Sequence, residues 1–273
     1  MTGDLKKLMD RVMDAAEACS AAIWVNDSPN ASPLTVKDNG TCGFVDTGER
    51  KLLVTAHHVL ADFQKKRATN PGAVLCVCLG PVSMFLEAPL VLDFDENTLD
   101  LAIIDFPHLD RIRNHQKQYF AIHELPIAVA RRGEAVTLVG FPGARRLTHA
   151  DFGAFEPAGL GYSVSDVSDR TIVLADESGT RRSEGIGIKE DEDIPLGGFS
   201  GTPGFVLRGN SLDLVGFLRA GSKQTQGGPA MVLPGVVFLS PATYLKADGT
   251  LDRLRMPYCP QGIRAHGMGG CGD

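Results

Sequence analysis

The sequence predicts an all-β protein of antiparallel sheets or barrels, preceded by one N-terminal helix. The 31 glycines and 16 prolines among 273 residues supply many turns. Short apolar runs with the two-residue period of strands follow from about residue 43 onward. No long helical pattern separates consecutive runs, whereas a parallel α/β sheet requires one. Strands are expected near residues 43–45, 51–54, 74–79, 101–106, 135–141, 171–175, 204–207, 212–218 and 235–239.

Residues 4–18 have the pattern of an amphipathic helix. Apolar side chains recur at helical spacing from Leu5 to Ala16, and charged residues such as Asp10 and Asp14 lie on the opposite face. The apolar stripe fits either packing against the protein's own domain or binding a regulatory partner. The Asp-, Asn-, Ser- and Pro-rich residues 26–40 are expected to form the linker into the main domain.

Composition and charge exclude several classes of protein. A net charge of −6 argues against binding to nucleic acid or to an anionic membrane. The longest uncharged stretch, residues 73–86, is too short to span a bilayer, and the first residues contain no secretory apolar core. We therefore expect a cytoplasmic protein whose six cysteines are free thiols. Phosphate-loop and dinucleotide fingerprints are missing, and the cysteines and histidine of the Gly-rich tail lack ligand spacing, so neither cofactor nor metal is expected.

Three short segments carry the chemistry. Leu52-Leu53-Val54-Thr55-Ala56-His57-His58 is an apolar strand that ends in histidines. Asp100 is a lone acid that opens the apolar run Leu101-Ala102-Ile103-Ile104. Ser200 lies between glycines in Gly197-Gly198-Phe199-Ser200-Gly201-Thr202-Pro203, just before another strand.

Together these segments could supply the groups that acyl transfer requires. His58 could act as the base, Asp100 as the carboxylate that fixes its tautomer, and Ser200 as the nucleophile. The backbone N–H groups of Gly198 and Ser200 could both face one oxyanion. A side chain at position 198 would obstruct that turn, because the turn requires a backbone conformation open mainly to glycine.

At these residues the sequence resembles the chymotrypsin-like serine peptidases of the trypsin superfamily, within their bacterial HtrA-like branch. Thr55-Ala56-His57-His58 is similar to the motif of the catalytic histidine, Asp100-Leu101-Ala102-Ile103 to the Asp-Leu-Ala-Leu motif, and Gly198-Phe199-Ser200-Gly201-Thr202-Pro203 to Gly-x-Ser-Gly-x-Pro. Two further stretches, residues 133–143 and residues 214–236, resemble the strand that opens the second barrel and the strands that wall the specificity pocket.

The resemblance implies two six-stranded antiparallel β-barrels, with the active site in the cleft between them. The expected divisions are 1–30 for the helix and linker, 31–130 for the first barrel, 131–250 for the second barrel and 251–273 for a Gly-rich tail. The family motif places the base just before Val59, so His58 is preferred over His57.

The resemblance also implies a specificity pocket made of Ile194, Arg219, Gly221 and Gly235. An uncharged, open pocket should prefer a large apolar side chain before the cut, because a basic one would be buried without a counter-charge. Arg219 stands in place of the serine in the Ser-Trp pair that the family usually has at this wall of the pocket, and it complicates this expectation.

Two departures bear on regulation. Phe199 stands where zymogen-activated relatives carry an aspartate that pairs with a newly cut N-terminus. Phe199 has no charge, so activation through such an ion pair is excluded. The charged residues 176–198 are expected to form a mobile surface loop that could control the site instead.

The function expected from these motifs is an active serine endopeptidase acting on a protein or peptide substrate. Two alternatives stay open. One is a binding or scaffolding protein that keeps the fold without turnover. The other is a processing protease, gated by a partner through the N-terminal helix, that cuts a single substrate.

Overall fold

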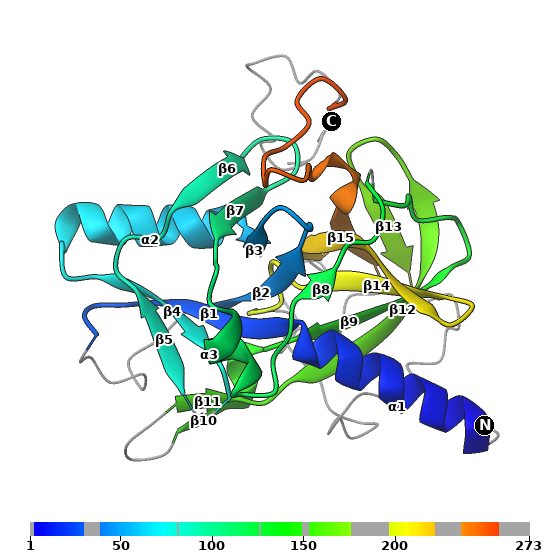
Figure 1. Cartoon of the computed structure of the whole chain (residues 1–273), viewed down its shortest axis with the longest axis horizontal. Helices are drawn as coiled ribbons and strands as arrows, with labels where there is room; N and C mark the ends of the chain where they lie inside the picture. Colours follow the sequence, from blue (N-terminus) through cyan, green and yellow to red (C-terminus); the bar gives the residue numbers. More distant parts are fainter. Residues whose placement is uncertain are drawn as a thin grey trace, which may run out of the picture.

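The computed structural model describes residues 3–29, 39–80, 82–125, 127–148, 153–175, 197–221 and 236–256. Two β units form its body, with one helix at the N-terminus (Figure 1). The all-β prediction is therefore confirmed. Among the residues described, no helix has both the length and the apolar character that a bilayer-spanning helix needs.

Helix α1 (Gly3–Ala18) contacts β9 (Ala135–Gly140) and β14 (Pro203–Arg208) of the second unit, and Figure 1 shows it next to β9. Its buried side chains include Val12, Met13 and Ala16. The last carbonyl groups of the helix accept hydrogen bonds from Ser20 Oγ, Lys117 Nζ and the Gln118 amide. The expected amphipathic helix thus packs on its own chain and is capped by it.

The first unit is one sheet with the strand order β5-β4-β1-β2-β3-β7-β6, and β8 pairs in parallel with β2. Its strands are β1 (Ser20–Asn26), β2 (Asn39–Asp46), β3 (Lys51–Ala56), β4 (Val74–Cys78), β5 (Ser83–Leu86), β6 (Val91–Asp95), β7 (Leu101–Asp105) and β8 (Phe120–Ala121). In the part of the chain described, this sheet stays open and has eight strands, where a six-stranded barrel was expected. The difference arises partly from β1, a strand within the first 30 residues that pairs with both β2 and β4.

The second unit is a closed barrel with the order β12-β13-β16-β15-β14-β9, which is the six-stranded barrel that was expected. Its strands are β9 (Ala135–Gly140), β12 (Ala158–Val167), β13 (Ile172–Ala175), β14 (Pro203–Arg208), β15 (Ser211–Gly221) and β16 (Val236–Pro241). All of its pairings are antiparallel.

Shorter elements complete the chain. Helix α2 (His57–Thr69) follows β3 directly, so one helix does intervene between strands where none was expected. The remaining elements are α3 (Leu109–Arg113), the 3₁₀ turns η2 (Gly143–Arg145) and η3 (Ala242–Tyr244), and the two-stranded sheet of β10 (Arg146–Thr148) and β11 (Gly153–Phe155).

One apolar cluster joins the two units. Val54 and Ile103 of the first sheet share it with Phe205 and Phe217 of the barrel. The described cysteines Cys19, Cys42, Cys76 and Cys78 are all buried free thiols. The Gly-rich tail beyond residue 256 and most of the charged loop 176–198 lie outside the described residues.

Candidate active site

His58 and Asp100 meet where β3 and β7 lie side by side. Ala56, the last residue of β3, is paired with Leu101, the first residue of β7. Because the two strands are antiparallel, this register places the residues that follow Ala56 beside the residue that precedes Leu101. His58 Nδ1 lies 2.8 Å from Asp100 Oδ2, and the His58 amide donates to Asp100 Oδ1 at 3.0 Å. Asp100 therefore holds both the ring and the backbone of His58.

This contact sets the electrostatics of the imidazole. The hydrogen bond to Asp100 raises the pKa of His58, burial opposes that change, and the charges of Asp100 and Asp62 add to it. The His58 side chain remains 49% exposed, so its other face is accessible to a substrate. A carboxylate on Nδ1 also favours the tautomer in which Nε2 is free to accept a proton.

The neighbouring His57 occupies a different environment. Both histidines were expected at a strand end, but they form the first two residues of α2. His57 is buried, and its ring stacks on Phe94 with the centroids 4.9 Å apart. Its amide donates to the carbonyl oxygen of Asp100. His57 thus contributes a backbone contact, and His58 presents its ring to the carboxylate.

Ser200 lies in a tight turn that depends on glycine. Gly198 has φ +100°, and an added Cβ there would lie 2.6 Å from both Asn39 Nδ2 and the Phe141 carbonyl oxygen. L-residues with side chains rarely adopt such a φ. The Thr41 hydroxyl donates to the Gly198 carbonyl at 2.7 Å, and the Thr41 amide donates to the Ser200 carbonyl at 2.8 Å.

The peptide groups that carry the Gly198 and Ser200 amides are held through their carbonyl oxygens: the Gly197 carbonyl accepts from the Gly143 amide at 3.0 Å, and the Phe199 carbonyl accepts from the Thr202 amide at 2.9 Å. Among the hydrogen bonds of the described residues, none has the Gly198 or the Ser200 amide as its donor. Two such unpaired amides are the donors that an oxyanion hole requires. Phe199, between them, is fully buried in the barrel core and anchors this turn.

The turn is pressed against the strand that leads to His58. A Cβ on Gly201 would lie 2.8 Å from the Ala56 amide nitrogen, two residues before His58. A Cβ on Gly40 would lie 2.7 Å from Val59 Cγ2 and 3.2 Å from the Ser200 carbonyl oxygen. Both glycines therefore allow a close approach of the turn to the base of α2. In the described structure no hydrogen bond joins Ser200 Oγ to His58.

Of the four residues expected to form the specificity pocket, the structure describes Arg219 and Gly221. Ile194 and Gly235 lie outside the described residues, and Gly221 ends β15. The Arg219 guanidinium is engaged elsewhere, because it donates to the Thr98 carbonyl oxygen at 2.7 Å and to Thr171 Oγ1 at 2.5 Å. The pocket itself stays a prediction.

Sequence reasoning missed Thr41 and Asp95. Thr41 follows no motif, and only its pairing opposite the Ser200 turn reveals its role. Asp95 Oδ1 accepts from the Thr98 and Leu99 amides at 2.7 and 2.6 Å. An Asp followed three residues later by Thr is a recognisable local turn signal that could have indicated this contact.

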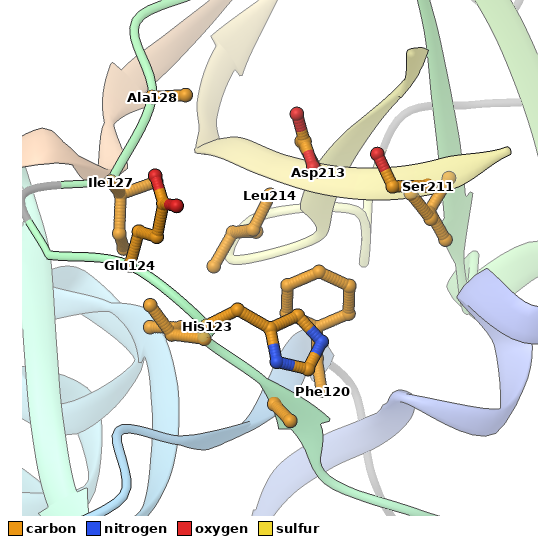
Figure 2. Close-up of a pocket in the computed structure, with 11 residues that line it drawn as sticks. Phe120, His123, Glu124, Ile127, Ala128, Ser211, Asp213 and Leu214 are labelled. Atoms are coloured by element: carbon orange, nitrogen blue, oxygen red, sulfur yellow. The ribbon is translucent and has the colours of Figure 1, made fainter. Parts of the chain in front are cut away.

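Other parts of the surface offer different chemistry. A cavity of about 350 Å³ lies between residues 120–124, residues 127–128 and the start of β15, and its lining includes Phe120, Ile122, His123 and Leu214. Figure 2 shows the residues that line it. The cavity contains none of the three predicted catalytic residues. Among the described residues, no group of three or more His, Cys, Asp or Glu is arranged to hold a metal ion.

Comparisons with known proteins concern the fold. No protein-family model and no curated protein matches the chain. It is similar to a crystal structure of the thermostable serine protease AL20 from an extremophilic microorganism, with 14% identity over 83% of this chain and 92% of that one and a TM-score of 0.44. It is also similar to an inactive serine-to-alanine mutant of Rv3671c from M. tuberculosis H37Rv, with 16% identity over 85% and 84% of the chains and a TM-score of 0.44. A serine endoprotease from Yersinia pestis matches with 13% identity over 85% and 61% of the chains and a TM-score of 0.46.

Proposed function

We propose that this protein is a serine endopeptidase that hydrolyses peptide bonds through an acyl-enzyme. Ser200 Oγ attacks the scissile carbonyl carbon while His58 Nε2 removes its proton. The proton then passes from His58 to the leaving amine, and the C–N bond breaks. Water, deprotonated by the same imidazole, releases the acyl group and restores Ser200. Asp100 keeps His58 in the required tautomer and stabilises its charged form.

The contact between His58 and Asp100 is the observation that carries the proposal. A surface ion pair needs only one contact, but Asp100 binds the ring and the amide of His58 at 2.8 and 3.0 Å. The turn at Ser200 supports the same chemistry, since its Gly198 and Ser200 amides donate to no described residue and could stabilise an oxyanion. Each such donor typically contributes ~3 kcal/mol to lowering the barrier.

Covalent labelling tests the proposal directly. A fluorophosphonate probe should label the wild-type protein at Ser200, and Ser200→Ala should abolish the label. Ser211→Ala, at an exposed serine of the same barrel, is the matched control and should label normally. Asp100→Asn should slow labelling by about 10³–10⁴-fold, because the amide selects the wrong tautomer of His58.

The absence of a label in well-folded protein would favour the binding or scaffolding alternative. No hydrogen bond joins Ser200 Oγ to His58 in the described structure, and this observation favours a latent or partner-gated protease as the second candidate. Such bonds are, however, often long before substrate binds. A processing protease would react with the probe yet leave a general substrate such as casein uncut. A partner that acts through α1 would bind its outer side chains, such as the 38% exposed Leu8 and Met9.

The preferred substrate is proposed to carry a large apolar residue before the cut. Ile194, Gly221 and Gly235 offer no charge to pair with a basic side chain. A peptide library varied at that position tests this, and a clear preference for Arg or Lys would refute it. We also propose a cytoplasmic location, because the four described cysteines are free and a reducing compartment keeps thiols in that state.

A further inference from the structure

The turn that presents Asp100 has an unusual backbone. Asp100 itself has φ +50°, a left-handed conformation that costs energy for a residue with a side chain. Within the turn, Asp95 Oδ1 accepts from the Thr98 and Leu99 amides. The carboxylate of Asp95 is in turn held by Arg253 NH1 at 3.3 Å. These contacts come from the first unit and from the C-terminal segment that follows the barrel.

The two carbonyl groups just before Asp100 are held from the second barrel. Arg219 donates to the Thr98 carbonyl oxygen at 2.7 Å, and the Ser240 hydroxyl donates to the Leu99 carbonyl oxygen. Thr98, Leu99 and Ser240 are buried, so a carbonyl group that lost its donor here would be poorly solvated by water.

A β-bulge directs Arg219 toward this turn. The pairing of β15 with β16 shifts register between Leu218 and Ala220, which leaves Arg219 as the extra residue. Such a bulge re-aims a side chain out of the normal alternation. The second terminal nitrogen of the Arg219 guanidinium donates a hydrogen bond to Thr171 Oγ1 at 2.5 Å, which fixes the orientation of the guanidinium group.

We infer that Arg219 is a positioning residue that locks the Asp100 turn from the opposite barrel and so keeps the Asp100 carboxylate on His58. The inference rests on the proposed function, in which that carboxylate orients the base. Catalytic groups must be held within about 0.5 Å of their productive geometry. A misplacement of about 1 Å can cost roughly 100-fold in rate.

The charge of Arg219 offers a rival explanation that predicts the opposite result. Burial lowers the pKa of Arg219, and the Asp100 carboxylate opposes that change, so the two charges interact. If charge alone mattered, removing Arg219 would free the carboxylate to stabilise the His58 imidazolium, and the pKa of His58 would rise. If positioning matters, Asp100 moves away and the pKa of His58 falls toward the ordinary 6.5.

The test follows the His58 imidazole by NMR titration, a measurement that does not need Ser200 to react. Arg219→Met, similar in length but without donors, should lower the pKa of His58 and slow fluorophosphonate labelling by about 10–100-fold. Arg219→Lys keeps one donor for the Thr98 carbonyl, so it should recover part of the pKa of His58 and part of the labelling rate. Thr171→Val removes only the second anchor and should shift both measurements in the same direction by less, about threefold in rate.

Arg208→Met is the matched control. Arg208 lies in the same barrel and bonds to Glu134 and Asp213, away from Asp100. It should leave the His58 titration unchanged and labelling within about twofold, because distant, independent sites act separately.

Each outcome decides the inference. An unchanged or raised pKa of His58 in folded Arg219→Met would overturn it, as would an equal effect of Arg208→Met. If Arg219→Met does not fold, Thr171→Val decides, and no shift there also overturns it. A wild type that resists labelling, while Arg219→Met still lowers the pKa of His58, would reject the peptidase and leave the positioning role standing.

Discussion

Gly201 is the residue at which one added methyl group should affect the candidate site most clearly. The glycine has φ +90° and lies between the Ser200 turn and the first sheet. An ideal Cβ in Gly201→Ala would lie 2.2 Å from the Thr41 carbonyl oxygen, 2.7 Å from Thr55 Oγ1 and 2.8 Å from the Ala56 amide nitrogen. Two of these three atoms belong to the backbone, so relief requires the turn to move away from the sheet.

The expected cost has two parts. The left-handed conformation costs a non-glycine residue roughly 1–2 kcal/mol. Overpacking against a fixed backbone adds about 1–3 kcal/mol. Gly133→Ala separates the two parts, because Gly133 has φ +81° with nothing within 4 Å of its Cβ position. We therefore expect a loss of about 2–5 kcal/mol in the unfolding free energy of Gly201→Ala, against about 1–2 kcal/mol for the control.

Equilibrium urea unfolding measures both losses, and fluorophosphonate labelling reads the site. Because the turn is displaced, labelling of Gly201→Ala should fall by about 10–100-fold while Gly133→Ala labels like the wild type. Equal losses of stability in the two variants would show that no clash exists at position 201. Wild-type labelling in Gly201→Ala would show that the close approach of the two units does not position the nucleophile.

Three further predictions follow from ionisable groups. Fluorophosphonate labelling should increase with pH through the pKa of His58, with a midpoint above the ordinary 6.5 because its carboxylate partner stabilises the imidazolium; a midpoint at or below that value contradicts the geometry. Arg208→Met should cost about 1–3 kcal/mol of unfolding free energy at neutral pH. Since the hydrogen bond from Arg208 lowers the pKa of Glu134, this cost should shrink as acidification protonates the carboxylate; a difference in unfolding free energy that stays constant across pH would refute it. Burial raises the pKa of Cys42, and that of Cys76 to about 12, so peptide mass spectrometry should find both unalkylated by iodoacetamide until the protein unfolds.

The strands that the sequence predicted are those with clear periodicity or strong β propensity. Strand β3, for example, is an apolar run ending at Ala56, near the expected boundary. Strand β1 was missed because its seven residues follow α1 with almost no turn signal and are nearly all buried, so they show no alternation. Strand β12 contains several Gly and Ser residues, and β6 has Asp at two of five positions, so local propensity argued against both. In each case tertiary pairing decided the structure.

The candidate site divides in the same way. Local motifs predicted His58, Asp100 and Gly198, because each has a chemical or conformational requirement that short sequence patterns express. The orientation of Arg219 could not be predicted, since it depends on a bulge in the pairing of two strands, which a single sequence does not reveal. The start of α2 at His57 was also missed, because no side-chain cap marks it.

The precision of the candidate site therefore depends on the interface between the two units more than on either unit alone. At that interface a Cβ on Gly43 would lie 3.2 Å from Phe217 Cε1, so the sheet and the barrel are in tight contact where β2 meets β15. Gly201 brings the nucleophile turn against the first sheet, while Arg219 reaches from the barrel to the turn that carries Asp100. One contact places the nucleophile turn of the barrel against the first sheet, and the other holds the Asp100 turn of the first unit from the barrel. A shift of the barrel relative to the sheet would therefore disturb the nucleophile and the acid together, even if each unit kept its own hydrogen bonds.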